Sequence, residues 1–375
     1  MFNQNHYVPI LKWKRGERTA LEKLTSTVKN NMTPLIEIQP VPFDHKERVF
    51  SKTLDQHLAE IGTQVKTAWG QDKPIFVDVN TLYENGDFSE EVLQSGQHPV
   101  EFIIDEIEAN GTKAIPVTGI YRYHSFHSSI KKMNDKYKSG VCLRLEEGEF
   151  SDTESLRKEI NNFLNYIKEK PENIDIILDY KQILPKQEAT HINNIILLLA
   201  QFPFISEWRT LTIASTAYPK TLQQIPTDSN GDIPRTEWEV YKKLSALSLG
   251  RTPSFGDYNI THPDFVNLDP RVINMAAGIR YTFDNKFYIF RGIGVKNNGF
   301  TQMVKICNDV INHTCYRGST FSFGDNEIYN CANQTRSTNG NAETWVTSGI
   351  NHHLTIVAQD ISNLPSTSVA HLLNT

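Results

Sequence analysis

The sequence has few cysteines, no long apolar run and no strong excess of charge of either sign. Four cysteines in 375 residues are too few for a disulfide scaffold, so we expect a reduced, cytoplasmic protein. The longest apolar stretch, IILLLA at 195–200, falls short of the roughly 18 residues that suggest a membrane span. The N-terminal MFNQNHYVPI lacks the layout of a signal peptide, and we expect no membrane contact.

The charge balance and the missing motifs exclude several well-marked classes of binding site. A net charge of -5 gives no general reason to expect duplex nucleic acid as a partner. The phosphate-binding pattern GxxxxGK[ST] and the zinc-binding HEXXH are absent, and no GxGxxG follows the first apolar run. A zinc site can be drawn from Cys307, Cys315, Cys331 and His313, but no CxxC spacing supports it.

Eight short apolar runs alternate with amphipathic stretches through the first two-thirds of the chain. The strand-like runs are 7–14, 34–39, 74–80, 113–118, 140–146, 173–180, 209–216 and 254–259. Strands that alternate with helices pair in parallel, so the pattern predicts an α/β fold, a TIM-type (β/α)8 barrel over residues 5–265. A doubly wound open sheet is the alternative.

The pattern changes after residue 265. Residues 279–292 predict a β-hairpin around Asp284 and Asn285, and residues 299–313 predict a helix. A segment rich in Gly, Asn, Ser and Thr follows. Because its apolar content is thin for an independent core, we expect residues 266–375 to pack on the barrel as an α+β elaboration.

Charged and amide side chains stand at the C-terminal ends of the predicted strands, where barrels of this type form their active sites. In most strands these side chains stand an even number of positions after apolar residues nearer the strand start, as Asp78 does after Phe76, so they point to the same face. This is expected if the barrel interior is packed at the bottom and polar at the mouth. The set comprises Lys12, Lys14, Glu37, Gln39, Asp78, Asn80, Arg144, Glu146, Asp179, Lys181 and Asp257.

These residues allow two interpretations. One is a structural network of ion pairs, since burying unpaired charges would cost several kcal/mol each. The other is a pocket for a small anionic ligand, in which Lys12, Lys14 and Arg144 bind phosphate or carboxylate groups.

Several chemistries fit the pocket, and no motif selects among them. Glu37, Asp78 and Asp179 are candidate acid–base or metal-binding groups, and Lys181 is a candidate catalytic residue. A lysine at the mouth could also form a Schiff base.

Three further features lie outside the strand ends. His124 and His127 are spaced to share one face of a helical turn, either as metal ligands or as a solvated pair. GINHHL at 349–354 is interpreted as strand, turn or cap, with at most one of its histidines reaching a site. Arg280, Tyr281 and Arg291 on the hairpin either cover the pocket or form cross-strand pairs.

Four segments occur in order over nearly the whole chain: YVPILKWKRGE, SFGDY, IRYTFDNKFYIFRG, and FSFGDNEIYNCAN with TWVTSGINHHL. Together they resemble the beta protein family of phages and bacteria. The resemblance implies a role in phage–host conflict but no particular reaction. The matching positions are Lys12, Lys14, Gly256, Asp257, Tyr258, Arg291, Gly292, Gly324, Asp325, Trp345, Asn351, His352 and His353. Of these, Asp257, Tyr258, Arg291, Asp325 and His352 join the predicted ligand-binding residues, with the segment around Asp325 and His352 closing the pocket.

The sequence thus predicts a barrel protein that holds a nucleotide or another phosphate-bearing ligand at its mouth, with hydrolysis as a candidate reaction. The alternative is a non-enzymatic interaction protein, either a phage inhibitor or a subunit of a host defence system. Its partner would be a phage or defence protein, and its charges would be structural. A nucleic-acid binder is a third class, which the acidic balance disfavours.

Overall fold

The computed structural model describes residues 2–83, 92–264 and 274–364. Eight parallel strands close into a barrel in the order β1-β11-β9-β8-β7-β6-β5-β2. They are β1 (Tyr7–Lys12), β2 (Leu35–Glu37), β5 (Pro74–Asp78), β6 (Lys113–Thr118), β7 (Val141–Glu146), β8 (Ile174–Gln182), β9 (Thr210–Thr216) and β11 (Ser254–Asp257). Each falls within or closely overlaps one of the eight predicted runs, and the predicted (β/α)8 barrel is confirmed.

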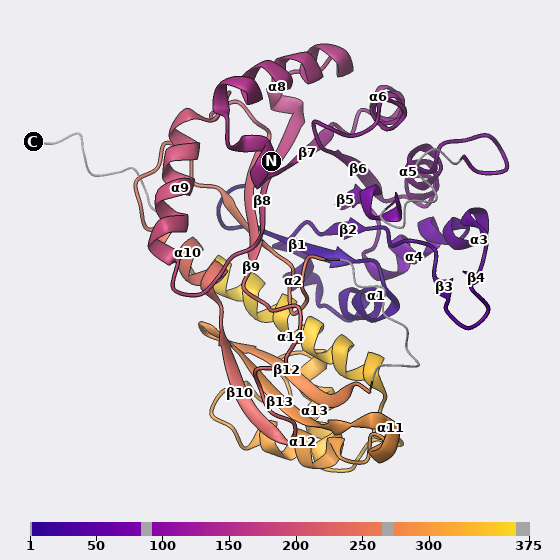
Figure 1. Ribbon diagram of the computed structural model, residues 1–375, viewed down its shortest axis with the longest axis vertical. Coiled ribbons are helices and arrows are strands. Elements are labelled where there is room, and N and C mark those ends of the chain that lie inside the picture. The colour runs from indigo at the N-terminus through magenta and orange to yellow at the C-terminus, as the bar shows by residue number, and fades with distance from the viewer. Residues whose placement is uncertain (1, 84–91, 265–273, 365–375) are drawn as a thin grey trace, which may run out of the picture.

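Helices surround the barrel and connect its strands (Figure 1). They are α1 (Arg15–Glu22), α2 (Ser26–Asn30), α3 (Leu54–Leu58), α4 (Ile61–Ala68), α5 (Pro99–Ala109), α6 (His124–Tyr137), α7 (Glu147–Phe150), α8 (Thr153–Ile167), α9 (Glu188–Gln201) and α10 (Thr236–Ser245). Short 3-10 turns lie at η1 (Asn80–Tyr83) and η2 (Pro171–Asn173), and β3 (Phe43–Asp44) pairs with β4 (Val49–Phe50). Local chemistry sets the helix starts. The carboxylate of Asp152 caps α8, for example, by accepting hydrogen bonds from the Glu154 and Ser155 amides.

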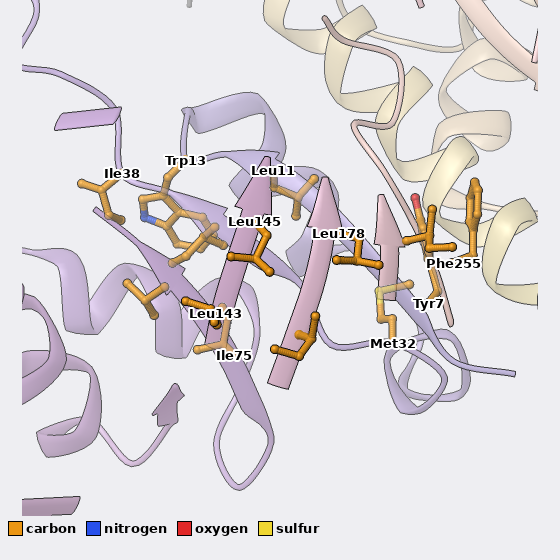
Figure 2. Packing of buried hydrophobic residues seen from close by; sticks show 14 of the residues in the cluster. Tyr7, Leu11, Trp13, Met32, Ile38, Ile75, Leu143, Leu145, Leu178 and Phe255 are labelled. Atoms are coloured by element: carbon orange, nitrogen blue, oxygen red, sulfur yellow. The ribbon is translucent and has the colours of Figure 1, made fainter. Parts of the chain in front are cut away.

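Alternate side chains of each strand point into the barrel or toward the helices. The interior cluster comprises Val8, Ile10, Leu35, Phe76, Ile115, Val117, Cys142, Ile177, Ala214 and Tyr258. Residues of opposite parity, such as Leu11, Leu145 and Leu178, pack in the layer between strands and helices (Figure 2). The lower interior is therefore mostly apolar, with the buried Asp175 at the start of β8 paired to Arg209 at 2.5 Å. Other charged residues of interior parity, such as Asp78, Arg144 and Asp179, lie at the mouth.

The C-terminal part forms a second layered unit beside the barrel (Figure 1). The predicted hairpin is present as β12 (Ala276–Phe283) and β13 (Lys286–Gly294), and β13 also pairs with β10 (Ser229–Pro234) from the connection after β9. The sequence analysis missed β10 because its residues, SNGDIP, carry one apolar side chain that is buried. Helices α11 (Val295–Asn298), α12 (Met303–Ile311), α13 (Phe323–Ala332) and α14 (Ala342–Ser362) complete the unit.

Helix α14 lies between the barrel and this sheet, where it packs against α1, β1, β12 and α13 (Figure 1). The interpretation of GINHHL as strand, turn or cap was wrong, because these residues are the centre of α14. Every residue from Thr347 to Ala358 is buried. Within the C-terminal unit, α14 contacts α1 and β1 of the barrel, and the predicted boundary at residue 265 lies outside the described residues. Among those residues, no helix combines the length and apolarity needed to cross a bilayer.

Candidate functional site at the barrel mouth

Arg144 of β7 lies at the centre of a buried group of charged side chains inside the mouth. Its Nε donates to Asp179 Oδ2 at 2.9 Å, and its Nη1 donates to Glu37 Oε1 and Asp78 Oδ2, each at 2.9 Å. Its Nη2 donates to the Tyr258 hydroxyl at 2.7 Å, which in turn donates to Asp179 at 2.5 Å. The structure thus brings together five predicted site residues, one from each of β2, β5, β7 and β8 and one that directly follows β11.

Arg122 completes this group, which we call the Arg144 network, and sequence analysis missed it. It follows β6 and binds both carboxylate oxygens of Asp78, at 2.6 and 3.1 Å. The strand β6 ends in Thr118 and carries no charge at its own tip. The available signal was therefore a basic residue four positions beyond a strand end that carries no charge.

The arginines lower the pKa of Asp78 more than that of Glu37. Burial, the largest effect on Asp78, would raise its pKa, but Arg122 and Arg144 together hold the pKa well below its usual range. Burial also raises the pKa of Glu37, and Arg144 offsets only part of that rise. Because burial raises the pKa of Glu37 and the arginines lower that of Asp78, Glu37 is the better placed of the two to take up a proton.

Basic groups gather around Asp264 at the rim of the mouth. Lys12 Nζ donates to the Asp264 carbonyl oxygen at 2.5 Å, Lys220 Nζ lies 2.9 Å from its carboxylate, and His262 Nδ1 lies 3.7 Å from it. The Lys220 hydrogen bond is the main cause that lowers the pKa of Asp264, with further help from the charge of Lys181. Lys181 itself pairs with Glu146 at 2.8 Å, and Lys14 is exposed. The rim is therefore more basic than the Arg144 network below it.

Four other predicted site residues do not contact the Arg144 network. Asp257 faces the helix layer, where it accepts from the Tyr7 hydroxyl at 2.5 Å and lies 2.9 Å from His353 Nε2. Asp325 pairs with His352 Nδ1 at 2.8 Å, and both side chains are fully buried. Arg291 donates to the carbonyl oxygens of Leu222 and Ile225.

The two SFGD segments therefore have parallel roles. The aspartates of both, Asp257 and Asp325, each pair with one of the two adjacent histidines of α14. These buried pairs connect α14 to the barrel through Asp257 and to the start of α13 through Asp325.

Metal binding finds no support in the described residues, which contain no group of three or more His, Cys, Asp or Glu side chains placed to hold an ion. The four cysteines are free and buried. His127 Nε2 lies 2.9 Å from the Gly119 carbonyl oxygen, in a local contact of its own helix start.

Glu17, in the first turn of α1, is a further candidate that sequence analysis missed. It is 4% exposed, and its burial raises its pKa to about 7, against the opposing charges of Lys14 and Lys12. Its position in KWKRGE, three residues after Lys14, was a weak signal, because surface helices commonly carry an acidic residue in the first turn.

Replacing Glu17 by Gln should remove a pH-dependent penalty on folding. With the pKa raised from 4.5 to about 7, the folded state binds the proton more tightly, so stability falls as pH rises through this window. Between about pH 4.5 and pH 8, the unfolding free energy of the wild type should fall by about 3 kcal/mol. Glu17→Gln should not show this fall, because its side chain does not titrate. Urea unfolding at both pH values measures this, with the exposed Glu47→Gln as control. Equal pH slopes in wild type and Glu17→Gln would contradict the prediction.

Comparison with known proteins gives one family and several distant structures. A family model described as "Beta protein" matches residues 7–359. Two mutant forms of the tryptophan synthase α-subunit of the hyperthermophile Pyrococcus furiosus each have a TM-score of 0.36, with 10% and 11% sequence identity, and cover 69% of this chain and 89% of theirs. No curated protein matches the chain.

Proposed function

The chain belongs to the Beta protein family, and from that premise we propose that it binds a small anionic ligand at the C-terminal mouth of its barrel. The ligand class is a nucleotide or another phosphate-bearing molecule. We also propose a cytoplasmic location, from the small number of cysteines, and a role in phage–host conflict, the setting that the family resemblance implies.

The observation that carries this proposal is the layering of charge at the mouth. Lys12 donates to the Asp264 backbone carbonyl oxygen, and Lys220 pairs with the Asp264 carboxylate. The charge of Lys181 also acts on that carboxylate. A basic rim above a polar floor attracts an anion to the mouth. We assign phosphate binding to Lys12, Lys14 and Lys181.

The Arg144 network forms the floor in this proposal. The contacts of Arg144 with three carboxylates and a tyrosine leave it a positioning role, in which it fixes Glu37 and Asp179 below the ligand. Glu37 would serve as acid–base group in a hydrolytic reaction, because its pKa is raised by burial.

A ligand screen by thermal shift tests the proposal, using nucleotides and sugar phosphates with and without Mg²⁺. A ligand at 100 times its dissociation constant should add about 2.7 kcal/mol to the unfolding free energy. Lys12→Met and Lys181→Met should each weaken the shift, whereas Lys158→Met, an exposed change on α8, should preserve it. Absence of any shift, or an undiminished shift in both mouth variants, would overturn the proposal.

The same samples decide whether the protein is an enzyme. If phosphate release accompanies binding and stops in Glu37→Gln while the thermal shift persists, the protein is a hydrolase. Binding without product makes it a binding protein.

The non-enzymatic alternative is favoured by one specific observation. Arg144 is 7% exposed and its guanidinium contacts three carboxylates and Tyr258, so the network is internally satisfied without a ligand. In that case the protein would act by binding a phage or defence protein. A stable complex in co-purification from phage-infected cells, together with no response in the ligand screen, would favour this alternative.

A further inference from the structure

A hollow of about 400 Å³ lies at the seam between the barrel and the C-terminal unit. The loop after β9, the hairpin β12–β13 and the first turns of α14 enclose it, elements that Figure 1 shows meeting beside the barrel. Its volume falls within the range of about 300–1,000 Å³ that is typical of small-ligand pockets. It is separate from the Arg144 network, with which it shares no lining residue.

Much of the wall of this hollow, which we call the seam pocket, is apolar. The apolar side chains include Met275, Ile289, Phe300, Trp345 and Val346. Such a wall favours a ligand with an apolar body, since each buried Å² of apolar surface contributes about 25 cal/mol.

The charged lining residues of the seam pocket are all basic. They are Lys220, Arg280 and Arg291, and the described lining contains no Asp or Glu. Arg291 donates to two backbone carbonyl oxygens, and Arg280 Nη1 donates to the Ile260 carbonyl at 3.3 Å. These neutral partners do not cancel the guanidinium charges. Ala342 adds the positive end of the α14 dipole.

Tyr218 supplies a second, independent indication of a ligand. It lines the seam pocket and is 3% exposed, yet its buried hydroxyl has no hydrogen-bond partner in the part of the chain that the structure describes. A buried hydroxyl without a partner is destabilising, and a polar ligand atom at hydrogen-bond distance would remove that cost. The Arg280 guanidinium lies over the Tyr218 ring, 5.6 Å from its centroid, so the cation and the tyrosine line the same wall of the pocket.

We propose that the seam pocket binds an organic anion with an apolar body, such as an aromatic or long-chain carboxylate or sulfonate. The guanidinium of Arg280 receives the anionic group, and Trp345, Phe300 and Met275 contact the apolar body. This site differs from the mouth in ligand class, because its lining joins an apolar wall to basic groups.

Two dyes of similar shape test both parts of the proposal. 8-Anilinonaphthalene-1-sulfonate has an apolar body and an anionic group, and N-phenyl-1-naphthylamine has a closely related body without charge. We expect the sulfonate to bind the full chain at a single site, with fluorescence enhancement, and the neutral dye to bind at least about tenfold more weakly, a difference of about 1.4 kcal/mol.

Substitutions in the lining test whether the sulfonate dye binds in the seam pocket. Met275 is 53% exposed at the edge of the seam pocket, so Met275→Glu should leave folding intact while it repels the anion. We expect Met275→Glu to weaken sulfonate binding at least about tenfold, or about 1.4 kcal/mol, and its neutral match Met275→Gln to weaken it less. Arg280→Met should weaken binding as strongly, with exposed Arg157→Met on α8 as control.

The outcomes separate this site from the mouth. Loss of dye binding in Met275→Glu and Arg280→Met, with retention in Lys181→Met, supports the seam pocket whatever the ligand screen at the mouth gives. Equal binding of the two dyes, or unchanged sulfonate affinity in Met275→Glu, would overturn it.

Discussion

Replacing Arg144 by methionine should lower the unfolding free energy by about 3–5 kcal/mol near neutral pH. The change removes the guanidinium that contacts Glu37, Asp78 and Asp179, whose side chains are all at most 7% exposed. Arg122 would still neutralise Asp78, but the other two carboxylates would lose their arginine partner. Two buried carboxylates without this partner carry the desolvation cost that makes a broken buried pair so destabilising.

Urea unfolding at neutral and acidic pH measures this loss. In Arg144→Met the deficit should shrink as pH falls, since protonation removes the charges that lack a partner. Arg15→Met is the matched control, because Arg15 is 72% exposed in its pair with Glu343 and such surface pairs contribute about 0–1 kcal/mol. A loss below about 1 kcal/mol in Arg144→Met would show that the mouth is already solvated and that the network is not structural.

Parity along the strands explains why the centre of the mouth could be predicted from sequence. In β5, Phe76 and Asp78 are two positions apart and therefore point to the same face, and Ile177 and Asp179 repeat this in β8. Once the strands are parallel and closed, these side chains must meet at one end. Asp257 was grouped with them although its parity is that of the helix layer, and its neighbour Tyr258 is the residue that reaches Arg144.

The features that could not be predicted lie in segments where the spacing of apolar residues indicates neither an amphipathic helix nor a strand. Arg122 follows its strand in an irregular connection, so nothing in its spacing aims it at Asp78. Helix α14 is buried on all sides between two units and lacks an amphipathic pattern, which is why its central GINHHL was misread. Strand β10 is recognisable only through its pairing with β13, far along the chain.

One residue, Lys220, lies beside both the seam pocket and the mouth, and its position could not be predicted from the sequence. Lys220 lines the seam pocket and pairs with Asp264, whose carbonyl oxygen also receives Lys12 from the mouth rim. The loop after β9 therefore contacts both proposed sites. A ligand that moves this loop at one site has a physical route to the other.

Asp257→Leu should also cost about 3–5 kcal/mol, because it leaves several buried groups without their acceptor. The carboxylate accepts from the Tyr7 hydroxyl and the Asn259 amide and pairs with His353, and Asp257 and His353 are at most 1% exposed. The loss should loosen α14 from the barrel. Asp135→Leu, on the exposed face of α6, is the control and should change stability by no more than about 1 kcal/mol.

The pH dependence distinguishes the loss of this pair from a simple packing defect. Burial lowers the pKa of His353, and Asp257 opposes that change. The folded wild type thus favours neutral His353, and its stability falls as pH drops below about 6.5, the unfolded value. Without Asp257 the pKa of folded His353 should be lower still, which widens the pH range between its folded and unfolded pKa values. The unfolding free energy of Asp257→Leu should therefore decrease more on acidification than that of the wild type. Urea unfolding between about pH 7 and pH 5 measures both slopes. A parallel loss at every pH would mean that His353 does not titrate against this carboxylate.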